Sequence, residues 1–163
     1  MAKMRQQREK AAEAQRPHRS PTLENRRARF EYEILESLEA GIALSGTEVK
    51  AIRAGGASIG EAYARFRNGE AWLVGMHVPP YKQGSFSNLD PGRARKLLLH
   101  REQIALLRSR VQEKGLTVVP LRLYFTRGMA KVQLGLARGK KLWDKRASIA
   151  KRDVEREIAR HGR

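Results

Sequence analysis

The sequence of 163 residues contains no cysteine, which excludes a disulfide framework, a thiolate zinc site and a cysteine nucleophile. Long apolar runs are also missing. The longest uninterrupted ones have four or five residues, whereas a membrane-spanning helix needs roughly 20. The first ten residues, MAKMRQQREK, lack the apolar stretch of a secretory signal. We therefore expect a cytoplasmic protein with no membrane partner.

Acidic residues are few beside the basic ones. Lys and Arg number 34 against 17 Asp and Glu, which gives a formal net charge of +17. So basic a balance indicates a polyanionic partner, and nucleic acid is the commonest one. The excess is greatest at the two ends, because residues 1–29 and 137–163 each carry +6, while the 107 residues between them carry +5.

Large apolar residues are concentrated in the middle of the chain. This distribution predicts a folded core over residues 23–136, a basic N-terminal arm over 1–22 and a basic C-terminal tail over 137–163. Segments of high charge and low hydrophobicity cannot offset the entropy lost on ordering, so we expect both ends to be disordered until a partner binds. The alternatives are that the arms only improve solubility, or that the tail forms a helix docked on the core.

Periodicity within the core indicates about six strands and two or three short helices. Apolar and acidic residues alternate over 30–34 as in a half-buried strand, and the alternation slips at 34–35, as at a bulge. Helices are expected over 45–54 and 101–114. Asn68-Gly69 is the strongest hairpin signal, because a type I′ turn needs positive φ at both central residues.

Hairpins dominate this pattern and no βαβ rhythm is present. The sequence therefore favours a mainly β fold, a small OB-like antiparallel barrel with two to three flanking helices and disordered basic tails. OB barrels commonly bind RNA, but a fold alone does not settle function.

The residue types of catalysis are not grouped in a usable way. The four histidines have no metal-ligand spacing, and the segment from Gly135 to Lys140 is one residue short of a phosphate-binding loop and lacks its Ser or Thr. We therefore expect a protein that is not an enzyme and needs no cofactor or metal.

Clustered cations are the more informative feature, since each phosphate they neutralise releases counterions. The candidates for contact with an RNA backbone are Arg26, Lys50, Arg53, Arg93, Arg95 and Lys96. Tyr32, Tyr81 and Phe86 are candidates for stacking on unpaired bases, although each could equally be a core or loop-anchoring residue.

The tail combines an aromatic residue with charge. Trp143 stands beside Asp144-Lys145-Arg146, which suits stacking on a base with cations on the flanking phosphates. Residues 147–160 have helical composition but only a thin apolar stripe, and an isolated helix of this length is marginal in water. We expect it to form only against a partner.

At these residues the sequence resembles the SsrA-binding protein (SmpB) family. The resemblance runs from about Asn25 to Arg146. It is carried by the segments NRRAR (25–29), EAGIALSGTEVKAIRAG (39–55), DP (90–91), RKLLL (95–99), GKK (139–141) and DKR (144–146). Residues 1–22 carry no family signal.

The resemblance implies an OB-like barrel with three flanking helices that binds the tRNA-like domain of transfer-messenger RNA at its D-loop and elbow. It implies delivery of this alanine-charged RNA, together with elongation factor Tu, to stalled bacterial ribosomes, where the nascent chain is tagged for proteolysis. The RNA-contacting positions that it implies are Asn25, Glu39, Leu98 and His100.

For the tail, the resemblance implies entry into the decoding centre and a helix in the empty messenger channel. The matching positions are Gly139, Lys140, Lys141, Asp144, Lys145 and Arg146, with Trp143 where relatives have histidine or another aromatic residue. Two other classes stay open, a structural ribosomal or initiation-type OB protein and, less well supported, an RNA-modifying enzyme.

Overall fold

The computed structural model describes residues 22–82 and 88–162, except the side chains of residues 142–144. The N-terminal arm up to residue 21, and Phe86, lie outside these residues. The elements in chain order are β1 (Leu23–Glu24), α2 (Arg26–Glu31), β2 (Tyr32–Ile42), α3 (Gly46–Ala54), β3 (Tyr63–Arg67), β4 (Glu70–Val74), β5 (Arg95–Leu98), α4 (Arg101–Lys114), β6 (Thr117–Thr126), β7 (Met129–Gly139) and α5 (Leu142–His161).

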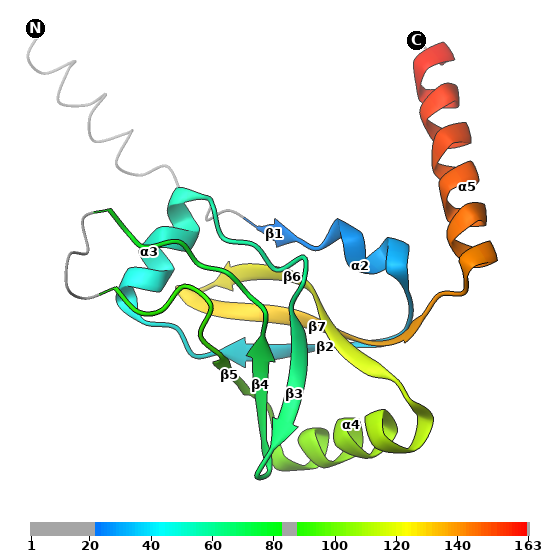
Figure 1. Ribbon diagram of the computed structural model, residues 1–163. Coiled ribbons are helices and arrows are strands. Elements are labelled where there is room, and N and C mark those ends of the chain that lie inside the picture. Colours follow the sequence, from blue (N-terminus) through cyan, green and yellow to red (C-terminus); the bar gives the residue numbers. More distant parts are fainter. Residues whose placement is uncertain (1–21, 83–87, 163) are drawn as a thin grey trace, which may run out of the picture.

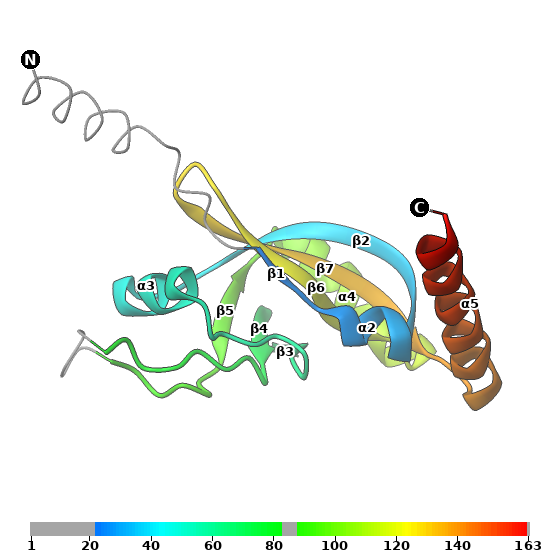
Figure 2. The ribbon, with the colours of Figure 1, turned by 90° about the horizontal axis from the view of Figure 1, so that it is seen from above.

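The strands form one antiparallel sheet in the order β1-β6-β7-β2-β5-β4-β3 (Figure 1). The sheet is bent, so that β3 and β4 turn out of the plane of the long strands β2, β6 and β7 (Figure 2). As a result β3 comes close to β6, although the two strands are not paired. It is not closed into a barrel, because β1 already occupies the edge of β6, with Leu23 opposite Leu123, and β3 pairs only with β4. The predicted antiparallel sheet is confirmed, while the prediction of a barrel is wrong. The described residues form a mixed α/β fold with four helices.

Local signals in the sequence place two features of the sheet correctly. The pairing of β2 with β7 shifts register between Ile34 and Glu36, where the slip in alternation predicts a bulge. Asn68 and Gly69 have φ values of 52° and 72°, so the β3–β4 turn has the positive φ that its sequence requires.

The helices α3 and α4 also follow their sequence signals, whereas α2 does not. Ser45 begins α3 with a capping box, in which its side chain accepts a hydrogen bond from the N–H of Glu48 and the Glu48 carboxylate accepts one from the N–H of Ser45. The alternation that predicts a strand from Phe30 starts too early, because residues 26–31 form α2 and β2 begins at Tyr32.

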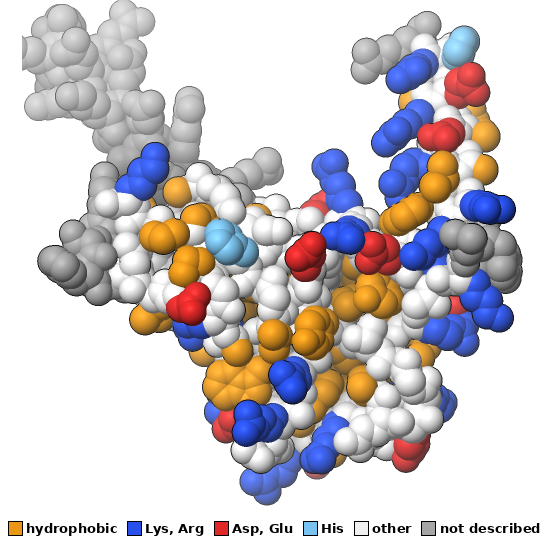
Figure 3. Space-filling view, viewed as in Figure 1, with side chains coloured by type: hydrophobic (Ala, Val, Ile, Leu, Met, Phe, Trp, Pro, Cys, Tyr) orange, Lys and Arg blue, Asp and Glu red, His pale blue; other side chains and the backbone are white. Residues whose placement is uncertain are grey.

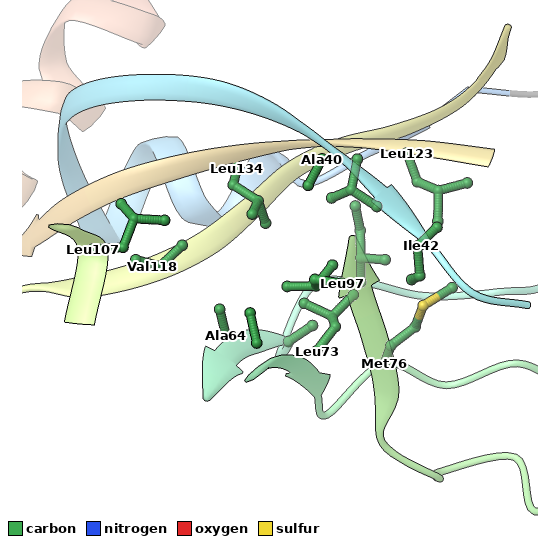
Figure 4. Packing of buried hydrophobic residues seen from close by; sticks show 14 of the residues in the cluster. Ala40, Ile42, Ala64, Leu73, Met76, Leu97, Leu107, Val118, Leu123 and Leu134 are labelled. Atoms are coloured by element: carbon green, nitrogen blue, oxygen red, sulfur yellow. The ribbon is translucent and has the colours of Figure 1, made fainter. Parts of the chain in front are cut away.

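The core lies between the two parts of the bent sheet. Leu73 and Leu97, from β4 and β5, are at most 1% exposed and face Leu134 of β7 across it (Figure 4). Leu107 brings α4 onto the same cluster. Fully burying one such side chain stabilises the fold by about 1.5–3 kcal/mol. The cluster therefore fixes the positions of the strands, and with them the residues on their outward-facing sides.

The tail differs from its prediction of disorder in the free chain. Residues 142–161 form the 20-residue helix α5, which projects from the rest of the protein (Figure 1). Its apolar residues Ile149, Val154 and Ile158 are 44%, 55% and 66% exposed, so it does not dock along the sheet either. Most of its residues are good helix formers, which gives the helix a local basis.

Candidate nucleic-acid interface

A groove of about 590 Å³ lies on the outer face of the sheet, where β2, β5 and β7 meet the start of α4. Four of the predicted RNA-contacting residues line it. They come from β2, from β5 and from the residue that precedes α4, and they are Glu39, Lys96, Leu98 and His100. The fold thus brings together residues that are up to 61 positions apart in the sequence.

Strand register gives the groove an apolar wall. Leu98 pairs with Gly41 of β2, and Gly41 pairs with Lys131 of β7. A Cβ atom on Gly41 would lie 3.1 Å from the Cβ of Leu98, so the absence of a side chain at residue 41 makes room for Leu98. The Leu98 side chain is 55% exposed and therefore offers an apolar surface between charged neighbours.

The carboxylate of Glu39 is held in place by two neighbours but can still accept further hydrogen bonds. It accepts a hydrogen bond from the Tyr124 hydroxyl, and its other oxygen lies 3.9 Å from the Nζ of Lys131. Burial, supported by the bond to Glu39, raises the pKa of Tyr124, so the hydroxyl stays a donor at neutral pH. The Glu39 side chain is 54% exposed, which leaves acceptor positions for a base edge.

Cations and the helix start complete the groove. The Nζ of Lys96 lies 3.1 Å from a Glu70 carboxylate oxygen, and both side chains are more than 40% exposed. The backbone N–H of His100 donates to Oε1 of Gln103, at 3.1 Å. This bond fixes the first turn of α4, and with it the exposed residue His100 at the edge of the groove.

Two of the predicted contact residues are buried inside the protein. Asn25 is 4% exposed, and its amide donates to the carbonyls of Ile59 and Pro120, at 3.2 and 2.8 Å. Its Oδ1 accepts from the N–H of Ala28 and caps α2. Asn25 therefore fastens α2 to β6, and its polar atoms are occupied inside the protein.

Arg95 is the second buried residue, with 0% exposure. Its Nε lies 2.6 Å from the carboxylate of Glu48 on α3. Its other nitrogens donate to the carbonyls of Met76, Pro91 and Arg93. With these donors engaged inside the protein, Arg95 positions the chain that leads into β5.

Glu48 carries the opposite charge at this point. Burial opposes its ionisation, but hydrogen bonds from Arg93, the N–H of Ser45 and Arg95 outweigh that effect and lower its pKa. Arg93 forms the second ion pair of this carboxylate. The predicted cation Arg93 is therefore largely engaged in holding the loop before β5 against α3.

The remaining predicted cations lie outside the groove. Arg26 is exposed on α2, and Lys50 and Arg53 are exposed on α3. The Nζ of Lys50 lies 5.8 Å from the centre of the Tyr81 ring, and the guanidinium of Arg53 lies 5.2 Å from that of Phe125. Such contacts stabilise by about 0.5–1 kcal/mol at exposed sites, and the ring of Tyr81 itself packs against the core.

The predicted tail begins inside β7, because residues 137–139 are the last three residues of that strand. The N–H of Lys140 donates to the carbonyl of Glu31, at 2.9 Å, and its Nζ donates to the carbonyl of Arg29 and to Oγ of Ser148, at 3.1 and 2.8 Å. Gly139 and Lys141 line a second hollow of about 660 Å³ beside these residues. Lys140 thus ties the start of α5 to α2.

One ring contact supports the same junction, because the guanidinium of Arg152 lies 5.5 Å from the centre of the Phe30 ring. Lys145 is half-buried near the junction, and Arg146 is exposed. The side chains of Trp143 and Asp144 lie outside the described part of the chain. In that part, α5 is anchored at its beginning and exposed beyond it.

Sequence reasoning missed several groove residues, among them Gly41, Glu70 and Lys131. It also missed Tyr124, whose hydroxyl donates to Glu39. The alternation over 129–136 already places Lys131 on the polar face of its strand. The register that sets it beside Gly41 pairs segments 90 positions apart, and no pattern in a single sequence gives that pairing.

Two absences are noted for the described residues. No helix among them is long and apolar enough to cross a membrane. Their His, Asp and Glu residues form no group of three that could hold a metal ion.

Comparison with known proteins decides the family. The family model described as SmpB protein matches residues 22–163. The chain belongs to the SmpB family. An SsrA-binding protein of Desulforudis audaxviator is 57% identical over 140 residues, which cover 86% of this chain and 92% of the relative. One from a Synechococcus strain is 60% identical over 145 residues, 88% of this chain and 94% of the relative.

A solved structure leads to the same family. The one described as "tmRNA-SmpB: a journey to the center of the bacterial ribosome" matches with a TM-score of 0.63 and 58% identity, over 75% of this chain and 86% of that chain. The resemblance seen in the sequence is confirmed. SmpB proteins are non-enzymatic RNA-binding proteins, so membership of the family sets aside the RNA-modifying enzyme.

Proposed function

We propose that this chain binds transfer-messenger RNA through the groove around Glu39, Leu98 and His100 and acts in ribosome rescue by trans-translation. SmpB proteins bind that RNA and have this role. The observation that carries the assignment to the groove is convergence. Three positions implied by the family resemblance line one groove together with Lys96 and Lys131, although Glu39 is about 60 positions from Leu98 and His100 in the sequence.

The groove offers three kinds of contact. The Glu39 carboxylate accepts hydrogen bonds from base amino groups. Leu98 packs against the face of a sugar or an unstacked base, and Lys96 and Lys131 lie where phosphates pass. Such a combination suits the elbow of a tRNA-like domain, since folded RNA is recognised by its shape and its unstacked loops.

In this proposal the projecting helix α5 has the ribosomal role. Its 20 residues span about 30 Å, and its exposed cations suit the phosphates of a messenger channel and decoding centre. A bound messenger would exclude the helix, so an empty channel is the condition for its entry. Elongation factor Tu accompanies the protein through the alanine-charged RNA.

A gel shift tests the proposal at one stated salt concentration. Labelled tRNA-like domain of transfer-messenger RNA is titrated with the full chain against an excess of ribosomal RNA fragments. We expect a complex that survives the competitor. Binding that the fragments abolish would favour the structural ribosomal or initiation-type protein and overturn the proposal.

A further inference from the structure

The outer face of the β3–β4 hairpin carries an aromatic residue between two cations. Arg65 of β3 pairs with Trp72 of β4, and Trp72 pairs with Lys96 of β5. Directly paired residues of antiparallel strands project to the same face of the sheet. Ala71 and Leu73, on either side of Trp72, are completely buried, so Trp72 belongs to the outward-facing set and is half-buried there.

This face is hollowed and positively charged. A depression of about 450 Å³ is lined by Arg65, Arg67 and Trp72 among others. Both arginines are exposed. Within residues 22–82 and 88–162, no carboxylate lies within ion-pair distance of either guanidinium. Over the hairpin, Figure 3 shows hydrophobic side chains with Lys and Arg around them.

The hairpin face continues the groove without a break. Glu70 and Lys96 line the groove, and they form an ion pair across β4 and β5. Glu70 also lines the hairpin depression, and Lys96 pairs with Trp72. A strand of RNA that leaves the groove past Lys96 therefore meets Trp72 next and the two arginines after it.

We propose that Trp72, Arg65 and Arg67 form a second RNA subsite, in which an unpaired base stacks on Trp72 while the arginines bind its flanking phosphates. The inference rests on the proposed function, because the ligand is the unpaired part of the same transfer-messenger RNA. A flat aromatic surface flanked by cations is the arrangement that binds unpaired nucleotides without reading their sequence. A second copy of this chain fits poorly, since it would bring the same unneutralised arginines face to face.

Fluorescence and affinity test the subsite together. The chain has two tryptophans, Trp72 and Trp143. The part of the fluorescence quenching that is lost in Trp72→Phe therefore comes from Trp72. On titration with the tRNA-like domain, we expect the intact chain to show this quenching. We expect Trp72→Ala to lose about 5- to 150-fold in affinity, as for one stacked base, and Trp72→Phe to lose much less.

The arginines have a separate readout. We expect Arg65→Ala to weaken binding and to make the slope of log affinity against log salt shallower by about 0.7–0.9, the share of one phosphate contact. Arg108→Ala is the matched control, because Arg108 is an exposed cation on α4 that lines neither the groove nor the hairpin depression, and both affinity and slope should stay unchanged. Thermal unfolding of each variant confirms that the fold persists.

The two proposals fail in different ways. Tight binding of the RNA by Trp72→Ala and Arg65→Ala alike, with no Trp72 share in the quenching, overturns the subsite and leaves the groove intact. Failure of the unaltered chain to bind the RNA at all overturns the proposed function first. Quenching by a ribosomal RNA fragment, but not by the tRNA-like domain, would also contradict this subsite.

Discussion

Glu39 shows at the scale of one residue how the sheet prepares a polar contact. Its carboxylate is oriented by the Tyr124 hydroxyl and by Lys131, so little side-chain freedom is lost when RNA binds. We expect Glu39→Ala to weaken binding of the tRNA-like domain by about 1–3 kcal/mol, or roughly 5- to 150-fold, the range for one good base contact. Gel shifts at fixed salt measure the change.

The matched control for this substitution is Glu113→Ala. Glu113 is an exposed carboxylate near the other end of α4, bonded only to Ser109 within the described residues. The substitution Glu113→Ala removes the same negative charge at a position away from the groove. Equal affinity of the Glu39 variant and the unaltered chain would show that this carboxylate does not touch RNA.

Gly41 acts through the space that it leaves. Gly41→Ala places a methyl group 3.1 Å from the Cβ of Leu98, and Leu98, which is half-exposed, has room to move outward. Crowding of this kind costs about 1 kcal/mol or more, and we expect the cost in RNA affinity rather than in thermal stability. A double-mutant cycle with Leu98→Ala checks this, because the second substitution should add little once Leu98 is displaced. Additive losses would contradict the expectation.

The connection between α3 and β5 is an element-scale feature, held by the buried ion pairs of Glu48. Glu48→Gln leaves the Arg95 guanidinium buried without its counter-charge, and removing one partner of a buried pair costs about 3–5 kcal/mol. We expect a correspondingly lower free energy of unfolding in denaturant. Glu36→Gln is the control, since Glu36 pairs with Arg110 at the surface, where such pairs contribute little.

The same carboxylate gives stability a pH dependence. Its pKa is lowered in the folded protein from the ordinary value of 4.5, so its contribution is complete above about pH 4.5. The contribution is lost as the pH falls through the folded-state value. Denaturant unfolding at a series of acidic pH values should show less of this loss in Glu48→Gln than in the unaltered chain. Identical acid dependence of the two proteins would contradict the assignment.

At the same scale, the sequence predicts those elements whose signals are local. The Asn68-Gly69 turn, the α3 cap and the bulge after Ile34 each depend on neighbouring residues, and each is where the pattern indicates. The roles of Arg93 and Arg95 depend on Glu48, which is 45 and 47 positions away. A single sequence does not distinguish a cation that neutralises a distant buried carboxylate from one that faces solvent.

The helix α5 differs from the expectation that the tail is ordered only by a partner. A marginal isolated helix is expected to need a partner, yet the first turns of α5 are tied to α2 by Lys140 and Arg152. This anchor fixes the start of the helix, and nucleation is its costly step. In the proposed function, the ribosome would therefore receive a helix that is already formed and that projects from the rest of the protein.

At the scale of the whole molecule, the family and four residues of the groove could be predicted because they lie in specific short segments. Closure of the sheet could not be predicted, since it depends on which strand occupies the edge of β6. The two-residue strand β1 takes that place, and so short a strand has no periodicity to detect. The same long-range packing decides that Asn25 is buried and that Trp72 is available at the surface.

The proposed RNA-binding groove and the proposed ribosomal helix α5 also lie apart in the molecule. The groove touches β7 at Lys131, and α5 leaves β7 after Gly139. Eight strand residues span about 27 Å, so the tail can be removed without disturbing the groove. We expect a chain that ends after Lys141 to bind the tRNA-like domain nearly as tightly as the full chain but to support no tagging on stalled ribosomes. A chain that ends after Arg160, which keeps nearly all of α5, should retain both activities. Loss of RNA binding in the shorter chain alone would move the main RNA site from the groove to the tail.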